Sequence, residues 1–265
     1  MKNILTIFRK EIASFFNSLI GYVVISVFLV GTGLFFWVFE YNILETGITQ
    51  MDTLFDMGPY MFLFLIPAIT MRAFSEEMKT GTIEFLYTKP LTTWQIILGK
   101  YLAGIFLVFF SLLPTLIYYL STYWLGLLDS TPQSGGTAVG QIIVSPFLGI
   151  SNLDTGATWG AYIGLFALGC LFTGIGLFTS ALTDNQIVAF ILAVFLCFFF
   201  YLGFDFLAGI KSLSGINEFF LELGMVAHYG SISRGVIDSR DILYFISFLT
   251  ISLILTHIVL QSRIK

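Results

Sequence analysis

Charged residues able to act on a partner gather in one stretch of this sequence, residues 71–100. Apolar runs flank it on both sides, and it holds seven charged residues: Arg72, Glu76, Glu77, Lys79, Glu84, Lys89 and Lys100. A short segment with charges of both signs can dock on another protein or touch lipid headgroups. We weigh two interpretations, a solvated loop in contact with headgroups and a docking surface for a partner.

A second charged group lies near the start of the chain, at Arg9, Lys10 and Glu11. Apolar residues recur around it at helical spacing, at Ile4, Phe8, Ile12 and Phe15. This pattern predicts a helix over 1–17 that lies in the membrane interface. Glu11 falls near the apolar stripe of that helix. Its carboxylate either reaches back to the headgroups or pairs with a basic residue from another segment.

Nucleotide-binding and metal-binding patterns are missing from this chain. Gly99-Lys100 is followed by Tyr101 and lacks the earlier glycine of a phosphate-binding loop. Cys170 and Cys197 both lie in apolar runs, and two cysteines are too few for a disulfide framework or a metal site. We interpret both as packing residues.

The two histidines do not suggest catalysis either. His228 and His257 fall on opposite sides of the membrane in the topology given below, so they cannot share a site. His257 sits near a helix end, where a packing role is the usual one. We expect no catalytic, metal or cofactor-binding residue in this chain, and hence no enzyme.

Composition identifies the solvent that these elements occupy. The 265 residues are 57% hydrophobic and 11% charged, against about a quarter charged in soluble domains. Only helices satisfy the backbone of single segments in lipid. We predict an all-α polytopic membrane protein, one domain over 1–265, with six transmembrane helices over 19–39, 58–74, 95–124, 158–182, 186–206 and 241–261.

Lys and Arg residues orient these helices. With a cytoplasmic N-terminus, nine of the twelve lie inside, at positions 2, 9, 10, 72, 79, 89, 100, 263 and 265. The positive-inside rule therefore places both termini in the cytoplasm. The outer segments, 125–157 and 205–241, then include an irregular Gly- and Ser-rich loop and a short amphipathic piece, "INEFFLELG", that is interfacial or re-entrant.

Local signals predict a compact hairpin over 75–94 on the inner side. Ser75 suits an N-cap, with acidic residues after it, and Gly81 is placed to end that helix. Pro90 stops any further helix, and Thr92 with Gln95 forms a capping box that opens the third span.

Small residues and prolines give packing cues. Gly160 and Gly164 form a G-x-x-x-G pair, which allows close approach within one subunit or between subunits. Pro67 and Pro114 are expected to kink their helices or to sit at breaks.

The hairpin resembles the signature region of the type-2 ABC exporter permeases. That family shows an Arg-x-(Phe/Ile)-x-x-Glu-(Lys/Arg/Glu) turn, then Gly-Thr-x-Glu-x-Leu, then (Thr/Ser)-x-Pro-(Leu/Val)-(Ser/Thr). The matching residues here are Arg72, Phe74, Glu76, Glu77, Gly81, Thr82, Glu84, Leu86, Thr88, Pro90, Leu91 and Thr92. The start "FRKEIASFFNSLIGYVV" is similar to the family's interfacial helix, with Leu19 where the family often has Pro.

Three further segments are most similar to the gliding-motility-associated ABC permease subunit of Bacteroidota. They are "YNIL", "NQIVAFI" and "HYGSISRGVIDSRDILYF". The resemblance implies a permease in the bacterial cytoplasmic (inner) membrane, with ATP used by a separate cytoplasmic ABC ATPase and a second, different permease subunit beside it. It implies no nucleic-acid partner.

In this family the inner hairpin couples the permease to its ATPase. The resemblance assigns that role to Arg72, Glu76, Glu77, Lys79, Gly81, Thr82, Glu84, Thr88 and Pro90, and the interfacial helix would contribute Arg9, Lys10 and Glu11. Export of a lipid, drug or other amphipathic substrate and a mechanical or scaffold role without transport stay open. A secondary transporter is disfavoured, because the spans lack ionisable groups away from their ends.

Overall fold

The structure is a computed structural model that describes residues 2–39, 51–83, 91–130, 154–210, 217–236 and 238–264. Every regular element within these ranges is a helix, which confirms the all-α prediction for them. The elements are α1 Lys2–Phe16, α2 Leu19–Trp37, α4 Asp52–Thr70, α5 Ser75–Lys79, α7 Thr93–Leu112, η1 Leu113–Thr115, α8 Leu116–Ser130, α10 Thr155–Leu182, α11 Gln186–Phe198, η3 Phe199–Gly203, α12 Phe204–Ala208, α13 Asn217–Leu223, α14 Met225–Ser233 and α15 Ser239–Ile264.

Five helical stretches in the described ranges are long and apolar enough to cross a bilayer. They are Asp52–Lys79, Thr93–Leu125, Thr155–Leu182, Gln186–Ala208 and Ser239–Arg263. α1 and α2 supply a sixth candidate only if together they are one span, because they meet at a bend of 72°. The count of six spans and the interfacial position of α1 stay predictions.

Prolines act differently in two of these helices. α4 starts at Asp52, earlier than the predicted 58, and continues as a helix through both Pro59 and Pro67. α7 ends at Leu112, and the single 3₁₀ turn η1, which contains Pro114, joins α7 to α8. This break confirms the interruption predicted at Pro114, where the missing proline N–H removes one helical hydrogen bond.

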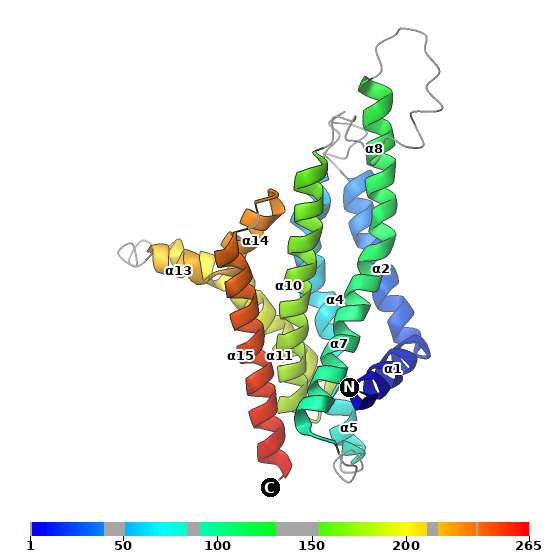
Figure 1. Ribbon diagram of the computed structural model, residues 1–265, viewed down its shortest axis with the longest axis vertical. Coiled ribbons are helices and arrows are strands. Elements are labelled where there is room, and N and C mark those ends of the chain that lie inside the picture. Colours follow the sequence, from blue (N-terminus) through cyan, green and yellow to red (C-terminus); the bar gives the residue numbers. More distant parts are fainter. Residues whose placement is uncertain are drawn as a thin grey trace.

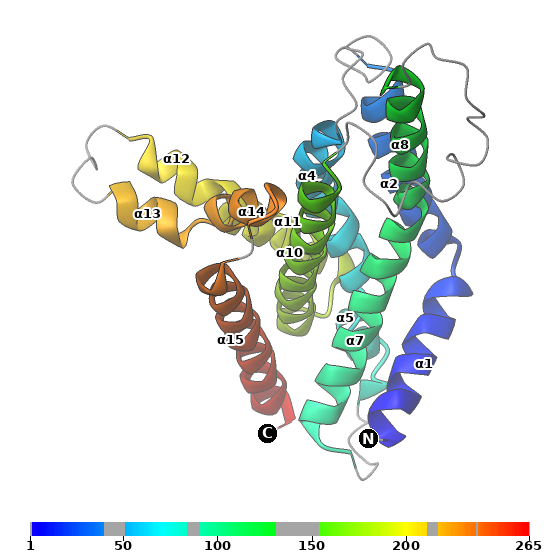
Figure 2. The same ribbon diagram turned by 45° about the horizontal axis from the view of Figure 1, so that its top comes forward.

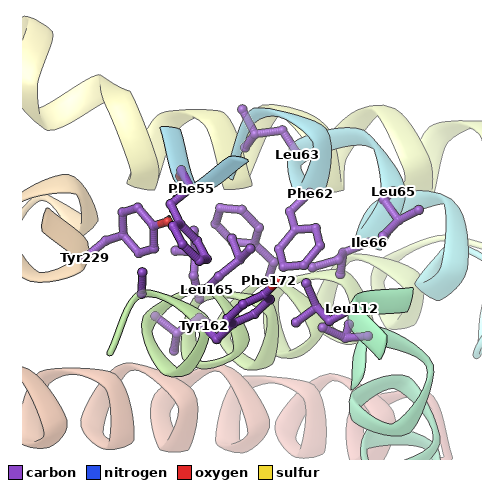
Figure 3. Packing of buried hydrophobic residues seen from close by; sticks show 14 of the residues in the cluster. Phe55, Phe62, Leu63, Leu65, Ile66, Leu112, Tyr162, Leu165, Phe172 and Tyr229 are labelled. Carbon is purple, nitrogen blue, oxygen red and sulfur yellow. Dashed lines mark hydrogen bonds between the residues drawn. The ribbon is translucent and has the colours of Figure 1, made fainter. Parts of the chain in front are cut away.

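α10 is the central helix of the bundle (Figure 1). It contacts α4, α7, α11, α14 and α15. Within its most apolar 18-residue stretch, 72% is buried. Figure 3 shows the core between α4 and α10, where Phe62 and Ile66 face Leu165 and Phe172. Burying such apolar side chains between the helices holds α4 against α10.

α11 and α15 lie at the side of this core. Only 28% of the most apolar 18-residue stretch is buried in the span that contains α11, and only 22% in α15. Large apolar side chains on them stay exposed, such as Phe195 at 61% and Ile246 at 58%. An apolar surface of this kind suits lipid or a neighbouring membrane subunit.

Both chain ends lie at the same end of the bundle, close to α5 (Figure 1). Arg263, in the last turn of α15, pairs with Asp184 at 2.6 Å and also contacts Leu182 O and Met78. The chain therefore brings its C-terminal helix to the α4–α7 link and to the short α10–α11 connection. This shared end is the one that the sequence assigns to the cytoplasm.

The other end carries the short helices α12, α13 and α14, which project sideways (Figure 2). His228 of α14 joins them to α15, with Nδ1 2.7 Å from Asp241 and Nε2 2.8 Å from Glu222 O. The amphipathic piece predicted in 205–241 is helical, as α13. Of the predicted irregular loop 125–157, residues 131–153 lie outside the described ranges.

Candidate functional site

The turn between α4 and α5 is attached to the central helix by one hydroxyl. Ser180 of α10 accepts hydrogen bonds from the N–H groups of Phe74 (2.9 Å) and Ser75 (3.2 Å). The same hydroxyl donates to Met71 O at 3.0 Å. Phe74 is 1% exposed and belongs to a cluster of buried apolar residues that includes Leu177 of α10. The start of the predicted hairpin is therefore fixed to the most buried helix.

Ser75 was predicted to cap α5, and this prediction is wrong. Phe74 occupies the N-cap position, without a side-chain cap. The Ser75 hydroxyl donates instead to Met71 O, one turn back. Ser180 already satisfies the N–H groups of Phe74 and Ser75, so the N-terminal turn has a tertiary partner in place of a local cap.

Other local signals behave as predicted. Gly81 follows the last turn of α5 with φ of +69°, a left-handed conformation that glycine adopts without strain. At the opposite end of the link, Thr92 caps α7 and exchanges hydrogen bonds with Gln95 in a capping box. These two features set where α5 ends and where α7 begins.

A group of four charges, two of them buried, joins the link to two other helices. Lys100 of α7 lies 2.8 Å from Glu11 of α1 and 3.0 Å from Glu77 of α5. Lys10 of α1 lies 2.7 Å from Glu77 and 3.6 Å from Glu11. We call these four residues the ion network. Two basic and two acidic groups make it neutral in sum.

Burial of two members of the ion network makes their pairing important for the fold. The side chains of Lys100 and Glu77 are only 2% and 11% exposed, whereas Lys10 is 58% exposed. The Lys100 ammonium also lies 5.2 Å from the centre of the Phe74 ring. Charges taken out of water must stay paired, since an unpaired buried charge costs several kcal/mol. α1, α5 and α7 are thus held in one arrangement.

The remaining predicted coupling residues divide by exposure. Arg9, Glu76, Lys79 and Thr82 are exposed, and Arg72 is partly buried. Three others lie outside the described residues, namely Glu84, Thr88 and Pro90. The structure therefore separates a set joined by ion pairs, Lys10, Glu11 and Glu77, from a set on the surface that makes no salt bridge among the described residues, namely Arg9, Glu76 and Lys79.

Sequence reasoning missed Lys100 and Ser180 as members of this site. One signal could have pointed to Lys100. It is a lone charge within an apolar helix, and Glu11 is a lone acid near an apolar stripe, so each suggests an opposite charge as its neighbour. The open question about Glu11 is thereby decided in favour of an ion pair. Ser180 has no comparable signal.

Several residues that could have carried chemistry have packing roles. His257 stacks on Trp94 of α7, with ring centres 4.5 Å apart. Both cysteines are free, and no group of three or more His, Cys, Asp or Glu suited to a metal occurs among the described residues.

The G-x-x-x-G pair serves packing within this chain. A Cβ on Gly160 would lie 2.7 Å from the Cα of Gly235, and one on Gly164 would lie 3.1 Å from Ile232. Both neighbours belong to α14 or the turn after it, so the pair allows α10 and this segment to touch closely.

Comparison with known families gives one match. The profile described as ABC-2 family transporter protein matches residues 5–260, nearly the whole chain. A search of curated proteins finds no match. A helical chain with several helices long and apolar enough to cross a membrane fits the family match, and such permeases work with an ABC ATPase. The chain belongs to the ABC-2 transporter family.

Proposed function

We propose that this chain is a non-catalytic permease subunit that couples ATP hydrolysis on a separate cytoplasmic ATPase to movement of membrane helices. The observation that supports this most is the ion network, together with the Ser180 contacts. They connect the α4–α7 link to α1, α7 and α10 through short, buried polar contacts. A force applied to the link would thus reach these three helices at once.

The outer surface of the link supplies the docking groups in this proposal. Glu76 and Lys79 are exposed on α5, and Thr82 follows Gly81 on the same exposed edge. The Thr82 hydroxyl lies 2.9 Å from that of Thr80, which orders the turn. Charges that the fold does not use are available to a partner, where they set orientation and specificity. Glu84 adds a further acid to this segment.

We place both termini and the link in the cytoplasm of a bacterium, with the chain in its inner membrane. The distribution of Lys and Arg supports this orientation. A second permease subunit completes the complex in our proposal. The exposed apolar faces of α11 and α15 are compatible with such a neighbour, and a protein interface there would bury side chains such as Phe195.

We assign the complex to gliding motility. This rests on the three segments that resemble the gliding-associated permeases, "YNIL", "NQIVAFI" and "HYGSISRGVIDSRDILYF". Export of a lipid, a drug or another small amphipathic substrate is the alternative, and so is a mechanical role in which no cargo crosses. The bacterium that encodes this chain should lose spreading motility when the gene is deleted, while its growth and its resistance to amphipathic drugs remain unchanged; loss of drug resistance alone would refute the assignment.

Charge reversal on the link tests the docking proposal. We expect Lys79→Glu and Glu84→Lys to reduce recovery of the ATPase in a pull-down from solubilised native membranes by at least about tenfold, because like charges at an interface cost several kcal/mol. Membrane insertion and amount of the chain should be unchanged. Arg240→Glu, an exposed reversal at the opposite end, is the matched control. Equal ATPase recovery in all variants would refute docking through this surface.

A further inference from the structure

A cavity of about 550 Å³ lies where α1 bends into α2, beside the ion network. Residues of α4, α5, α7 and α10 complete its wall. This volume falls in the range of about 300–1,000 Å³ that is typical of small-molecule sites. The ATPase-docking proposal does not use this cavity, although Glu76 belongs both to the docking surface and to the lining.

The lining has a charged side and an apolar side. Its charged residues are Lys10, Glu11, Arg72, Glu76, Glu77 and Lys100. Its apolar residues include Phe15, Ile69, Leu107 and Leu177. A site divided in this way matches an amphipathic molecule better than a simple ion.

Two of the six charges are not used by the ion network. Arg72 donates from Nη1 to Ser18 Oγ at 3.4 Å, and its Nε is buried without a hydrogen-bond partner among the described residues. A buried donor left unpaired costs roughly 1–3 kcal/mol, so a group that accepts from it would be stabilising. Glu76 is exposed and also makes no salt bridge among the described residues.

The cavity lies beside the surface that suits acyl chains. Leu19 and Tyr22, next to the lining residues Ser18 and Gly21, are 80% and 58% exposed. Arg9 and Lys10 on α1 are exposed as well, which fits the headgroup level of a bilayer. Basic pockets between membrane helices at the cytoplasmic face bind anionic lipid headgroups, and the lining here differs because acidic residues accompany the basic ones.

We propose that this cavity binds the headgroup of a zwitterionic phospholipid with a primary ammonium. The phosphate accepts hydrogen bonds from Arg72, including its unpaired Nε, and the ammonium donates to Glu76. The equal number of basic and acidic groups in the lining favours a neutral headgroup over an anionic one. Arginine suits the phosphate because its planar fork gives two parallel hydrogen bonds to oxygen atoms.

Native mass spectrometry of the purified full-length chain tests this proposal, with phosphatidylethanolamine, phosphatidylglycerol and inorganic phosphate as probes. We expect phosphatidylethanolamine to bind the wild type more tightly than phosphatidylglycerol, and Arg72→Gln to weaken its binding at least about tenfold, since a charge-assisted bond is lost. Glu76→Gln should remove the preference between the two lipids. Arg9→Gln and Glu218→Gln, exposed residues that do not line the cavity, are the matched controls.

Thermal unfolding gives a second measurement that does not depend on gas-phase adducts. Phosphatidylethanolamine should raise the midpoint for wild type and for Arg9→Gln, because a ligand that binds only the folded state stabilises it. The rise should be absent in Arg72→Gln. If Arg72→Gln fails to fold, the lipid preference of Glu76→Gln decides the question.

Three results would overturn the proposal. The first is equal phosphatidylethanolamine binding in wild type and Arg72→Gln. The second is a preference of the wild type for phosphatidylglycerol. The third is binding of inorganic phosphate that phosphatidylethanolamine does not displace, which would indicate a site for a free anion. None of these results depends on ATPase recovery, so the docking proposal can fail or hold separately.

Discussion

At the scale of single residues, Lys100 matters most for this structure. It is the most buried charge of the ion network, and it meets acids from α1 and α5 that are distant in sequence. Attraction between such groups offsets their loss of hydration only while all partners are present. Glu11 and Glu77 therefore depend on Lys100, and Lys10 can replace only part of its charge from an exposed position.

Lys100→Met should destabilise the chain by about 3–5 kcal/mol, the typical cost of removing one partner of a buried pair. Thermal unfolding of the purified protein in detergent measures this change. Lys79→Met, at an exposed position, should stay within about 0.5 kcal/mol of the wild type. The double variant Glu11→Gln with Lys100→Met should lose less than the sum of both single variants, since the two residues interact directly. A loss for Lys100→Met no greater than for Lys79→Met would contradict this role.

At the scale of elements, the position of α10 depends on close contacts that only glycine allows. Gly160 touches the turn at Gly235, and the neighbouring Ile232 carbonyl would lie 3.0 Å from an added Cβ. Backbone atoms cannot move aside as a flexible side chain can. α14 and the turn after it are thus attached to α10 by shape, whereas His228 joins α14 to α15 through Asp241 and to α13 through Glu222 O.

Gly160→Ala should cost about 1–3 kcal/mol through overpacking against that backbone. Gly230→Ala is the matched control, because a Cβ there would meet nothing within 4 Å. That change in a helix should be neutral or stabilising by up to about 1 kcal/mol. The two variants can be compared by size-exclusion recovery after heating. Equal recovery would show that α10 and α14 separate without cost.

At the scale of the whole molecule, α15 separates two chemically different ends. Its 26 residues correspond to roughly 39 Å of helix. One end carries Arg263 beside α5, and the other carries Asp241 beside His228. A membrane crossed by this helix would leave α5 and α13 on opposite sides.

Labelling with a membrane-impermeant maleimide tests which side is which. In a background with Cys170→Ala and Cys197→Ala, we expect Glu218→Cys on α13 to react in intact spheroplasts. Lys79→Cys on α5 should react only after the membrane is opened. Both positions are exposed, so accessibility within the protein does not limit either reaction. The reverse pattern would invert the proposed orientation.

The sequence by itself determined what depends on composition and on neighbours a few residues apart. Apolar runs identified the long helices, because burial in lipid needs about 20 apolar residues whatever their order. Gly81 and the Thr92–Gln95 capping box were predictable, since a positive φ and a cap each involve a single turn of chain. The residues in 71–92 that resemble the family signature also form a local pattern, so the sequence alone pointed to the family.

Only the tertiary structure decided how distant segments meet. Glu11 and Lys100 are 89 residues apart in the sequence, and Ser180 and Phe74, which share a hydrogen bond, are 106 residues apart. Such pairs form when helices pack in one particular order, and no local pattern encodes that order. Ser75 illustrates the difference. Its type and place predicted a cap, but α10 brought Ser180 to the N–H groups of Phe74 and Ser75, and the Ser75 hydroxyl donates to Met71 O instead of capping α5.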